Sequence, residues 1–464
     1  MGEKFDIAFL GGGPAGYQGA IRAAQLGARV AVVETKFLGG VCLNGGCIPT
    51  KAVRASAEVA RTVRRAREYG FHELSPTPDI RAIISRKERI VAGLRGSIER
   101  LFQANRIALV EGQGRLISAN QIEVEKNGQA GLVEAAKIVV ATGSSPVSLS
   151  VMPSGPRVFL ADEMLDITYL PKHLMVIGGG AVGVEMAAIF RELNCPVTIV
   201  EAMERLLPAE DAEMSAYLQG ILQRRRVKVF CGIQVVSVDA TDEGFVIKLS
   251  NGSELTPDTI IQAVGRRFNT ERIGVHELGV EMDHDRIVVD ECLKTNIPGL
   301  YAAGDVIGGW LLAHVAFAEG ICAAEHALGR ESKMDYRVIP RCVFSLPEYA
   351  AVGLSEEEAA SRYPTKVARF PFKSLGMAQA MGELEGLVKV IVHTTTDHIL
   401  GCHIIGPHAA DLVAEIAVAM QWNLPSKAVM NTIHTHPTLS EAVLETAQAL
   451  HGQAIHIPPE GERQ

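Results

Sequence analysis

The chain has 464 residues, too many for one hydrophobic core, and this length suggests about three or four domains. Its composition, 47% hydrophobic and 21% charged, is that of an ordinary globular protein. The 45 basic and 53 acidic residues are spread along the chain and give a net charge of −8, which argues against a nucleic-acid-binding surface.

The first predicted element is a buried apolar strand that starts at Phe5 and leads into a glycine-rich turn. An alanine-rich helix and a second apolar strand follow, and the second strand ends at Glu34. In a dinucleotide-binding unit of this order, Gly11 permits the tight turn, Gly13 lets the backbone approach a pyrophosphate, and Gly16 lets the helix pack closely. The helix N-terminus would hold the phosphates, and Glu34 would accept hydrogen bonds from a ribose.

Neither a secretory nor a membrane-spanning segment is expected. Only residues 2–4 separate Met1 from the first apolar strand, which is too short for a signal peptide. The most membrane-like stretch, residues 174–190, contains four glycines and a glutamate, so it is predicted to be a strand, a turn and a helix. We therefore expect a cytoplasmic protein without a membrane partner.

Cys42 and Cys47 stand apart from the other cysteines. Five residues of regular helix rise about 7.5 Å, which exceeds the roughly 7 Å limit between bridged Cα atoms. A disulfide therefore needs a local distortion, for which Gly45 and Gly46 give the freedom. A small, distorted loop stores strain and is easily reduced, so a redox-active pair is favoured over two free structural thiols. The other cysteines lack metal-ligand neighbours, so no metal site is expected and they are predicted to be buried small hydrophobes: Cys195, Cys231, Cys292, Cys322, Cys342 and Cys402.

The strand–turn–helix–strand–acid order returns in the middle of the chain. Its turn carries Gly178, Gly180 and Gly183, and its second strand ends at Glu201, the same number of residues after the first glycine as in the first copy. Two complete copies predict two dinucleotide sites, one for a bound flavin and one for a nicotinamide nucleotide. A carboxylate at Glu201 would repel a ribose phosphate and favours NAD over NADP, although the nearby Arg205 leaves NADP open.

Further elements complete an α/β chain. Pro146 and Pro153 bracket a loop, and residues 265–270 close the second nucleotide unit. Residues 388–393 are predicted to be a sheet strand, and residues 409–420 have the apolar spacing of a helix.

The segment Gly39-Gly-Val-Cys-Leu-Asn-Gly-Gly-Cys-Ile-Pro-Thr-Lys51 resembles the signature of the class I pyridine-nucleotide:disulfide oxidoreductases. Its Leu-Asn and Ile-Pro choices most resemble the dihydrolipoamide dehydrogenase branch of that family. The likeness covers essentially the whole chain, because residues 141–143, 295–305, 312–314 and 434–441 are similar to its later flavin and active-site motifs. Val41, Gly46 and Phe268 depart from the usual threonine, valine and proline.

The resemblance implies a fold of two Rossmann-like dinucleotide-binding domains and a C-terminal α+β dimerisation domain. The expected boundaries are residues 1–147 for the first part of the FAD-binding domain, 148–268 for the NAD-binding domain, 269–340 for a central segment completing the FAD site, and 341–464 for dimerisation.

The resemblance also implies roles for individual residues. Cys47 would lie next to the flavin ring as the charge-transfer thiolate, and Cys42 would exchange with the substrate dithiol. Lys51 would approach the flavin and pair with Glu185, and Asp305 would bind the ribityl chain. The implied FAD contacts are Gly11, Gly13, Gly16, Glu34, Lys51, Thr142, Gly143, Gly304, Asp305, Ala313 and His314. The implied NAD contacts are Gly178, Gly180, Gly183, Glu185, Glu201 and Gly265.

His436 would be the general base, with Glu441 orienting it, and in the family this histidine comes from the other subunit of a homodimer. The chemistry agrees, because a thiol must become a thiolate to attack a disulfide and histidine titrates near working pH. Pro437 is expected to be the first residue of a helix, which would leave His436 exposed just before it. His434 is expected to be structural.

The implied reaction oxidises dihydrolipoamide to lipoamide and reduces NAD. The lipoyl group would belong to a partner subunit of a 2-oxo-acid dehydrogenase or glycine-cleavage complex. Sister FAD disulfide reductases remain alternatives, but Glu201 disfavours the NADP-dependent glutathione reductases and residues 458–464 lack the cysteine pair of mercuric reductases. A mainly structural subunit of the complex is a further alternative, which the complete redox set disfavours.

Basic side chains after Lys51 leave two interpretations open. Arg54 stands where the family usually has leucine, and a guanidinium near the dithiol channel would lower thiol pKa values or favour a charged substrate. A solvent-facing arginine is favoured instead. Residues 61–67 are similarly predicted to be the exposed face of a helix.

Overall fold

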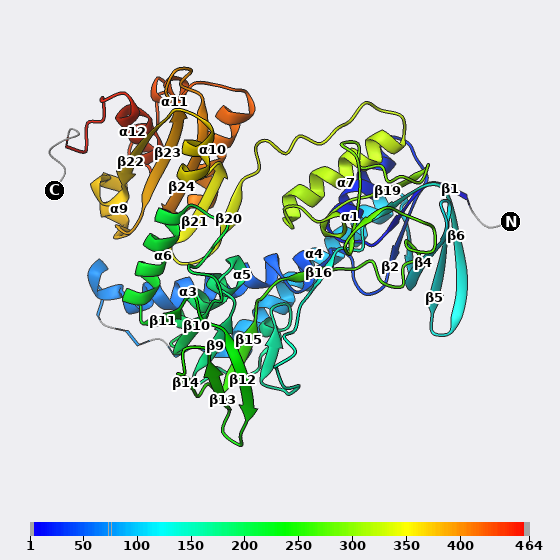
Figure 1. Ribbon diagram of the computed structural model, residues 1–464, viewed down its shortest axis with the longest axis horizontal. Helices are drawn as coiled ribbons and strands as arrows, with labels where there is room; N and C mark the ends of the chain where they lie inside the picture. Colours follow the sequence, from blue (N-terminus) through cyan, green and yellow to red (C-terminus); the bar gives the residue numbers. More distant parts are fainter. Residues whose placement is uncertain (1–3, 73, 76, 459–464) are drawn as a thin grey trace.

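The computed structural model describes residues 4–72, 74–75 and 77–458. It contains two parallel sheets with helices against them and a third, antiparallel sheet towards the C-terminus (Figure 1). The predicted fold class, two Rossmann-like units and a C-terminal α+β domain, is confirmed. No helix within the described residues is long and apolar enough to cross a membrane.

The first sheet has a parallel core whose strands are buried because helices cover it. β1 pairs in parallel with β2 and β6, β2 with β3, and β6 with the distant β19. The antiparallel β4 and β5 extend it beyond β6. The strands are β1 (Lys4–Leu10), β2 (Val30–Glu34), β3 (Ala108–Glu111), β4 (Gln113–Ser118), β5 (Gln121–Lys126), β6 (Gln129–Val140) and β19 (Leu300–Ala302).

Helices α1 (Pro14–Gln25) and α7 (Ala313–Ala327) come from opposite ends of this domain's sequence and pack side by side. Their backbones touch because glycines replace side chains at the contact. A Cβ on Gly320 of α7 would lie 2.0 Å from the Ala15 carbonyl oxygen, and one on Gly19 of α1 would lie 2.6 Å from the Gly320 oxygen. The late segment of the chain is thereby held against the first nucleotide unit.

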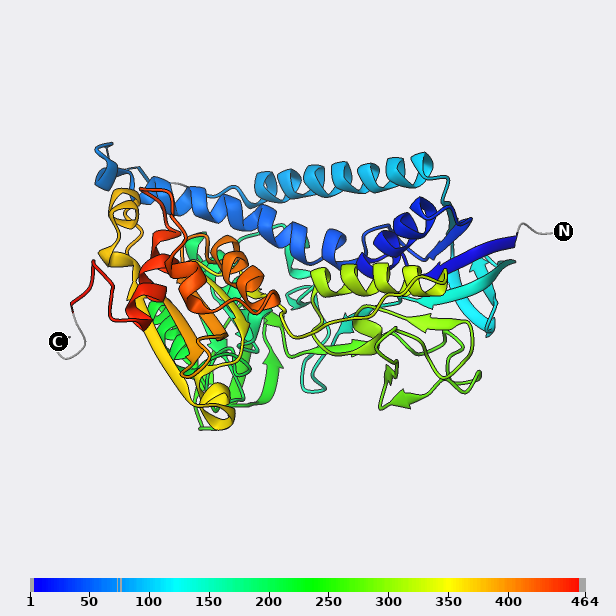
Figure 2. The ribbon, with the colours of Figure 1, turned by 90° about the horizontal axis from the view of Figure 1, so that it is seen from above.

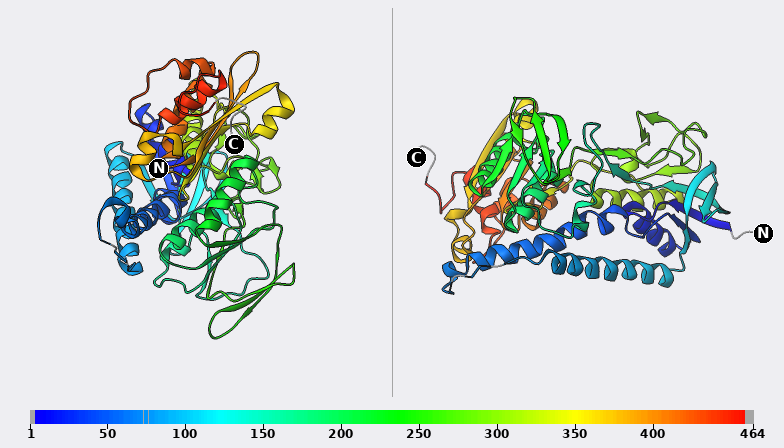
Figure 3. Two further views of the ribbon diagram at one scale, coloured as in Figure 1. Left: turned by 90° about the vertical axis from the view of Figure 1, so that its left-hand side faces the viewer. Right: turned by 90° about the horizontal axis from the view of Figure 1, so that it is seen from below.

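A long helical excursion joins β2 to β3. It contains α2 (Gly40–Asn44), α3 (Cys47–Arg64), the 3₁₀ turn η1 (Ala66–Tyr69) and α4 (Ile80–Ala104). Figures 2 and 3 show α4 lying along α3, and α3 reaching towards the C-terminal domain.

The basic cluster at the end of α3 was predicted to face solvent, which holds for Arg67 but not for the three arginines that pack against carboxylates. Arg61 and Arg65 each form an ion pair with Glu383 of the C-terminal domain, and Arg64 pairs with Glu192. The excess of positive charge is neutralised by carboxylates that lie far away in the sequence, which local spacing does not reveal.

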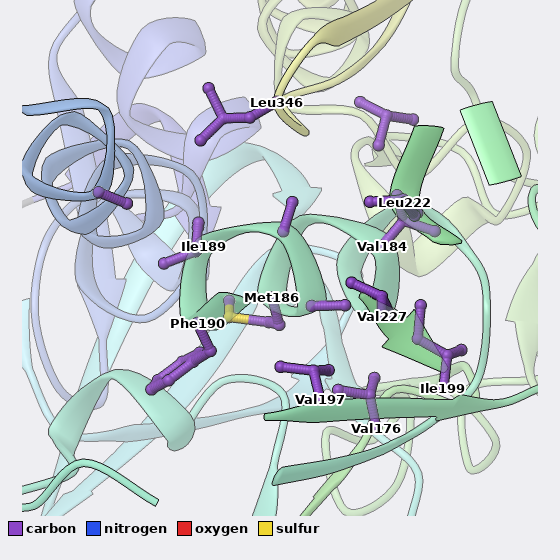
Figure 4. Packing of buried hydrophobic residues seen from close by; sticks show 14 of the residues in the cluster. Val176, Val184, Met186, Ile189, Phe190, Val197, Ile199, Leu222, Val227 and Leu346 are labelled. Atoms are coloured by element: carbon purple, nitrogen blue, oxygen red, sulfur yellow. The ribbon is translucent and has the colours of Figure 1, made fainter. Parts of the chain in front are cut away.

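The second nucleotide unit is a parallel sheet in the order β11-β10-β9-β15-β8. Figure 4 shows Met186 and Phe190 of its helix α5 facing Val176 and Val197 on the strands, while Leu346 covers the other side of the helix. Burial on both sides explains why this helix is apolar almost all round. Its elements are β8 (Val158–Leu160), the 3₁₀ turn η2 (Met164–Asp166), β9 (Leu174–Ile177), α5 (Ala181–Glu192), β10 (Val197–Val200), α6 (Ala212–Arg224), β11 (Val227–Phe230), β15 (Thr259–Gln262) and the small antiparallel sheet of β12 (Val235–Ala240), β13 (Phe245–Leu249) and β14 (Glu254–Leu255).

The chain crosses between the two units on a short antiparallel pair, β7 (Ser144–Pro146) with β16 (Arg266–Phe268). It then returns through β17 (Met282–Asp283), β18 (Arg286–Ile287), β19 and η3 (Asp305–Ile307) to α7. The predicted return of the late segment to the flavin site therefore has a structural basis in the β19–β6 pairing.

The C-terminal domain is an antiparallel sheet in the order β20-β21-β24-β23-β22 with helices packed on it. The predicted strand at residues 388–393 and helix at residues 409–420 are confirmed as β23 and α10. Its elements are β20 (Arg341–Val343), β21 (Glu348–Gly353), α8 (Glu356–Arg362), β22 (Thr365–Pro371), η4 (Phe372–Ser374), α9 (Gly376–Met381), β23 (Leu387–His393), β24 (Ile399–Gly406), α10 (Ala409–Gln421), α11 (Ser426–Met430) and α12 (Glu441–Leu450).

Candidate active site

Cys42 and Cys47 lie on either side of a break between two helices. Cys42 is inside α2, Cys47 is the first residue of α3, and the chain leaves helical geometry at Gly45 and Gly46, as predicted. Both are free thiols, half-buried and hydrogen-bonded to one another. A Cβ on Gly46 would lie 3.2 Å from the Val41 carbonyl oxygen, so the tight turn favours glycine there.

The surroundings separate the two thiols electrostatically. The hydrogen bond donated by Cys42 lowers the pKa of Cys47 to about 7, against the opposing effect of burial and with help from the Lys51 charge. The same hydrogen bond, burial and the neighbouring Cys47 charge raise the pKa of Cys42 well above its ordinary value. In the reduced pair, Cys47 is therefore the thiolate and Cys42 the thiol.

Lys51 is held at the junction of three segments. Its ammonium group lies 3.1 and 3.3 Å from the Glu185 carboxylate oxygens on α5, the ion pair that the sequence predicted. It also lies 4.1 Å from the centre of the Phe344 ring, and the Phe344 amide donates to Glu185 over 2.8 Å. The positive charge that stabilises the Cys47 thiolate is therefore fixed in place.

The first glycine turn forms a cradle of the kind that a dinucleotide needs. A Cβ on Gly11 would lie 2.3 Å from the Ala141 oxygen, and one on Gly16 would lie 1.9 Å from the Gly11 oxygen. A Cβ on Gly13 would clash with nothing, because the nearest atom is the Gly40 Cα at 3.7 Å. No side chain caps the N-terminus of α1, so its amides are free to bind a phosphate. The described residues therefore fit the pyrophosphate of FAD.

Glu34 closes the same turn from the end of β2. One carboxylate oxygen accepts a hydrogen bond from the Gly12 amide (2.7 Å) and the other from the Lys36 amide (2.8 Å). Each Glu34 oxygen keeps a lone pair that can accept a hydrogen bond from a ribose, the role that the sequence predicts for this residue.

The β7–β16 pair carries a set of polar side chains that are hydrogen-bonded to one another and to Asp305. Ser144 donates to the Asp305 carboxylate and accepts from the Arg266 guanidinium (2.7 Å), which also forms a bidentate ion pair with Asp162. The sequence pointed to Asp305 but missed the three residues that hold it. Ser144 directly follows the Ala141-Thr-Gly143 motif, which was the one available signal.

Other predicted flavin residues lie nearby in the fold. Gly143 and Gly304 have positive φ angles of 71° and 80°, and the Thr142 hydroxyl donates to the Asn269 oxygen (2.8 Å). Ala313 is the first residue of α7, and His314 contacts the Pro340 oxygen at 2.9 Å.

The second glycine turn repeats the cradle. A Cβ on Gly178 would lie 2.3 Å from the Ala263 oxygen and one on Gly183 would lie 2.0 Å from the Gly178 oxygen, while nothing lies within 4 Å of a Cβ on Gly180. Glu201 accepts hydrogen bonds from the Gly179 and Met203 amides, as Glu34 does in the first copy. Gly265 has a φ of 130° at the start of the crossing strand. These residues fit NAD.

Arg205, which left the choice of nucleotide open, is engaged elsewhere. Its guanidinium donates to the Pro208 oxygen (3.2 Å) and the Glu210 oxygen (3.4 Å). The charged side chain expected at the ribose is then the Glu201 carboxylate. A carboxylate repels the extra phosphate of NADP, so this arrangement favours NAD.

His436 and Glu441 form a dyad at the start of α12. The His436 ring nitrogen Nδ1 lies 2.8 Å from Glu441, whose other oxygen accepts from the Thr438 amide at 2.9 Å. Burial opposes ionisation of Glu441, but these hydrogen bonds outweigh it and lower its pKa. The helix starts at Glu441 rather than at Pro437, so the predicted helix start was wrong: Thr438 donates its amide to Glu441 and its hydroxyl to the Thr435 oxygen, which closes a turn ahead of the helix.

The His436 side chain is 77% exposed, and none of its described contacts reaches Cys42 or Cys47 of its own chain. The printed contacts therefore do not bring the dyad and the cysteine pair together within one chain. His434, by contrast, is buried and hydrogen-bonded to Glu415 (2.8 Å), as expected of a structural residue.

Arg54 does not face solvent, so the favoured interpretation of this residue was wrong, while an influence on the choice of substrate stays a prediction. Its side chain is 13% exposed and pairs with Glu348 of the C-terminal domain (2.9 Å) and Glu58 (3.0 Å). It is not among the charges that shift the pKa of Cys42 or Cys47. Arg54 attaches α3 to the C-terminal sheet.

The remaining cysteines are compatible with a packing role. Four are buried and two, Cys231 and Cys342, are half-buried, which departs in part from the prediction. Among the described residues, no group of three ligating side chains is placed to hold a metal ion.

Two family models match the chain. The pyridine nucleotide-disulphide oxidoreductase model matches residues 5–320, and the dimerisation domain model of the same family matches residues 339–447. A dihydrolipoyl dehydrogenase from Chlamydia muridarum is 37% identical over 99% of both chains, and one from Thermus scotoductus is 40% identical over 98% of this chain and 99% of its own.

Solved structures are similar over almost the whole chain. LpdA from Mycobacterium tuberculosis has a TM-score of 0.90 and 30% identity, covering 97% of this chain and all of that one. The HOCl-induced flavoprotein disulfide reductase RclA from Escherichia coli has a TM-score of 0.87 and 26% identity, covering 96% and 99% of the two chains.

Proposed function

Because this chain belongs to the pyridine nucleotide-disulphide oxidoreductase family, we propose that it oxidises dihydrolipoyl groups to lipoyl groups and reduces NAD. It is an oxidoreductase that uses FAD and NAD, and its dimerisation domain pairs it with a second copy of itself. The dihydrolipoyl substrate is supported by the curated relatives, which carry that name over the full length of the chain.

The observation that carries the proposal is the polarised cysteine pair. Cys42 and Cys47 are in hydrogen-bond contact, and Cys47 is the thiolate of the two at neutral pH. In the oxidised pair, Cys47 is consequently the better leaving group, because its thiolate is stabilised by Lys51. Attack of a substrate thiolate is therefore directed to the Cys42 sulfur.

Two thiol exchanges then oxidise the substrate. His436 of the partner subunit takes the proton from the first substrate thiol, whose thiolate attacks Cys42 and releases Cys47 as a thiolate. The second substrate thiolate attacks the mixed disulfide, closes the lipoyl disulfide and releases Cys42, which takes up a proton. The substrate has lost two electrons, and the reduced pair holds them.

The two cradles hold the groups that take the electrons onward. We assign the flavin to the Gly11–Gly16 turn with Glu34 and Asp305, and NAD to the Gly178–Gly183 turn with Glu201. An FAD held there would supply the redox chemistry by which the two electrons of the reduced pair pass to NAD⁺ as a hydride. The residues of this chain would position the nucleotides and keep Cys47 ionised.

The natural substrate is a lipoyl group on a partner subunit of a 2-oxo-acid dehydrogenase or glycine-cleavage complex.

We also assign residues 1–147 and 269–340 to flavin binding, 148–268 to NAD binding and 341–464 to dimerisation. The antiparallel C-terminal sheet and the exposed His436–Glu441 dyad support the last assignment.

The test is to mix the purified protein with dihydrolipoamide and either NAD or NADP and to follow reduced nicotinamide by absorbance. We expect turnover with NAD that is lost in Cys47→Ser and Cys42→Ser, while a matched Cys402→Ser variant, altered at a buried cysteine, stays active. Reduction of the flavin by other dithiols but not by dihydrolipoamide would contradict the substrate and support a sister disulfide reductase.

A further inference from the structure

Glu319 is a buried carboxyl that the reaction does not use. It lies on α7 with only 4% of its surface exposed, and the described residues give it no cationic partner. Burial, the largest influence, raises its pKa to about 7, and the nearby Asp305 charge adds to the effect. A carboxyl is costly to bury unless its oxygens make specific hydrogen bonds, so its partners indicate its role.

The first partner is the turn that leads to Asp305. Glu319 accepts a hydrogen bond from the Gly304 amide over 2.7 Å. Gly304 has a φ of 80° and is confined between Ala15 and Ala316, with a Cβ placed there lying 3.3 and 3.6 Å from their methyl groups. The carboxyl therefore fixes the backbone immediately before Asp305, whose own side chain accepts from Ser144.

The second partner is on the extended connector, residues 330–340, which joins α7 to the C-terminal domain (Figure 1). The Tyr336 hydroxyl donates to the other Glu319 oxygen over 2.8 Å. The adjacent Asp335 accepts from the side chain of Gln421 on α10, at 3.5 Å. One connector segment thus touches both the flavin-binding segment and the dimerisation domain.

We propose that Glu319 is a positioning residue for the flavin: it sets the Gly304–Asp305 turn and, through Tyr336, ties that turn to the connector. The inference rests on FAD as the resident cofactor, which the proposed function includes, and not on the identity of the dithiol substrate. Binding of FAD and ordering of the connector therefore favour one another.

The chemistry of the two contacts selects the variants. Glutamine can keep both, because its amide oxygen accepts from Gly304 and its NH₂ donates to the Tyr336 oxygen. Alanine loses both and leaves the Gly304 amide unpaired in a buried position. Tyr336→Phe removes only the connector contact. Glu445→Ala is the matched control, because Glu445 on α12 is similarly buried and accepts from a backbone amide, that of Ile455 (3.0 Å), but contacts neither the turn nor the connector.

The experiment measures FAD release from each holoenzyme by flavin fluorescence, alongside unfolding by circular dichroism and hydrogen exchange at residues 330–340. We expect Glu319→Ala to weaken FAD binding by at least roughly tenfold and to release FAD well below its unfolding temperature. Glu319→Gln should stay within about threefold of the wild type, and Glu445→Ala should leave FAD affinity unchanged. Tyr336→Phe should speed exchange at the connector and weaken FAD binding to an intermediate extent.

Unchanged FAD affinity in Glu319→Ala, or equal weakening in Glu319→Ala and Glu445→Ala, would overturn the inference. Loss of FAD by Glu319→Gln as large as by the alanine variant would also overturn it. If the alanine variant does not fold, the test rests on Tyr336→Phe. Hydrogen exchange at residues 330–340 and an FAD affinity that both match the wild type would then contradict the inference. A wild-type protein without FAD would instead overturn the cofactor assignment, and one that holds FAD but ignores dihydrolipoamide would overturn only the substrate.

Discussion

Cys47 differs from the other cysteines in the contacts around its sulfur. It begins α3, accepts a hydrogen bond from Cys42 and lies near the fixed charge of Lys51. Cys195 and Cys342 are affected mainly by burial, which raises the pKa of each to about 12. At neutral pH these two remain thiols, so the reactive thiolate is selected by local electrostatics.

Replacing Lys51 with methionine should raise the pKa of the Cys47 thiol by about one unit, because a nearby positive charge is removed. Since the lowered pKa places the thiolate above about pH 7 in the wild type, the variant should need a higher pH for the same reactivity. The pH dependence of alkylation of the reduced protein by iodoacetamide measures this shift. Arg54→Leu is the control, and an equal shift in that variant would contradict the role of Lys51.

At the scale of elements, the two nucleotide units use their glycines for different physical purposes. The first and last glycine of each turn are required by backbone contacts of about 2 Å that a Cβ would make. A Cβ on the middle glycine would clash with nothing: it would make an ordinary contact with Gly40 at 3.7 Å from Gly13 and meet nothing within 4 Å from Gly180, so glycine is needed there only if a ligand approaches the backbone. The three positions look equivalent in a sequence but should respond differently to alanine.

Gly180→Ala should fold normally and keep its flavin, because nothing lies within 4 Å of the added methyl group. It should raise the KM for NAD by roughly tenfold, since the methyl occupies the place of the pyrophosphate. Flavin reduction by dithiol without NAD should be unchanged, which stopped-flow absorbance measures. Gly183→Ala should instead lose stability, because its methyl would lie 2.0 Å from the Gly178 oxygen. A Gly180→Ala variant with normal KM for NAD would contradict the nucleotide assignment.

At the scale of the whole molecule, a buried ionic cluster joins the second nucleotide unit to the C-terminal sheet. Lys389 on β23 is 1% exposed and pairs with Asp211 and Glu213 at 2.9 Å and with Glu356 at 2.6 Å. Asp211 also caps α6 by accepting from the Met214 amide. The pKa of Asp211 is lowered, because the Glu356 amide and Lys389 outweigh the opposing effect of burial.

Lys389→Met should reduce the free energy of unfolding by about 3–5 kcal/mol, because it leaves the buried Asp211 carboxylate without its cationic partner. A carboxyl whose pKa is lowered by folding stabilises the protein above its unfolded pKa of about 4, and this contribution is lost as the pH falls. The difference in melting temperature between the wild type and Lys389→Met should therefore narrow below about pH 5. Replacing the exposed Lys248 with methionine should change stability little. If the difference in melting temperature between the wild type and Lys389→Met did not change with pH, the ion pair with Asp211 would not be its cause.

The exposed His436–Glu441 dyad makes a prediction about the dimer. Chains carrying Cys47→Ser and His436→Gln should each be nearly inactive, with a loss of roughly 10²–10⁴-fold for the histidine variant. A heterodimer of the two has one intact site if the histidine comes from the partner, and none if it comes from the same chain. Recovery of activity after co-expression and purification of the heterodimer would support the shared site, and no recovery would place the base elsewhere.

The sequence by itself determined the features that depend on neighbours along the chain. Glycine spacing and apolar strands predicted both cradles, and Gly45 with Gly46 predicted the helix break between the cysteines. These inferences hold because a turn, a cap or a strand face is set by residues a few positions apart. The Pro437 helix start failed even locally, because the amide and hydroxyl of Thr438 close a turn ahead of the helix.

Only the tertiary structure decided which charges meet across the domains. Arginines of α3 and of the turn after it were predicted to face solvent, yet four of them pair with carboxylates more than a hundred positions away along the chain: Arg54, Arg61, Arg64 and Arg65. The Glu319–Gly304–Tyr336 contacts and the Lys389 cluster had no sequence signal for the same reason. A buried charge is stable only beside a specific partner, and that partner is fixed by how the domains pack rather than by the local pattern.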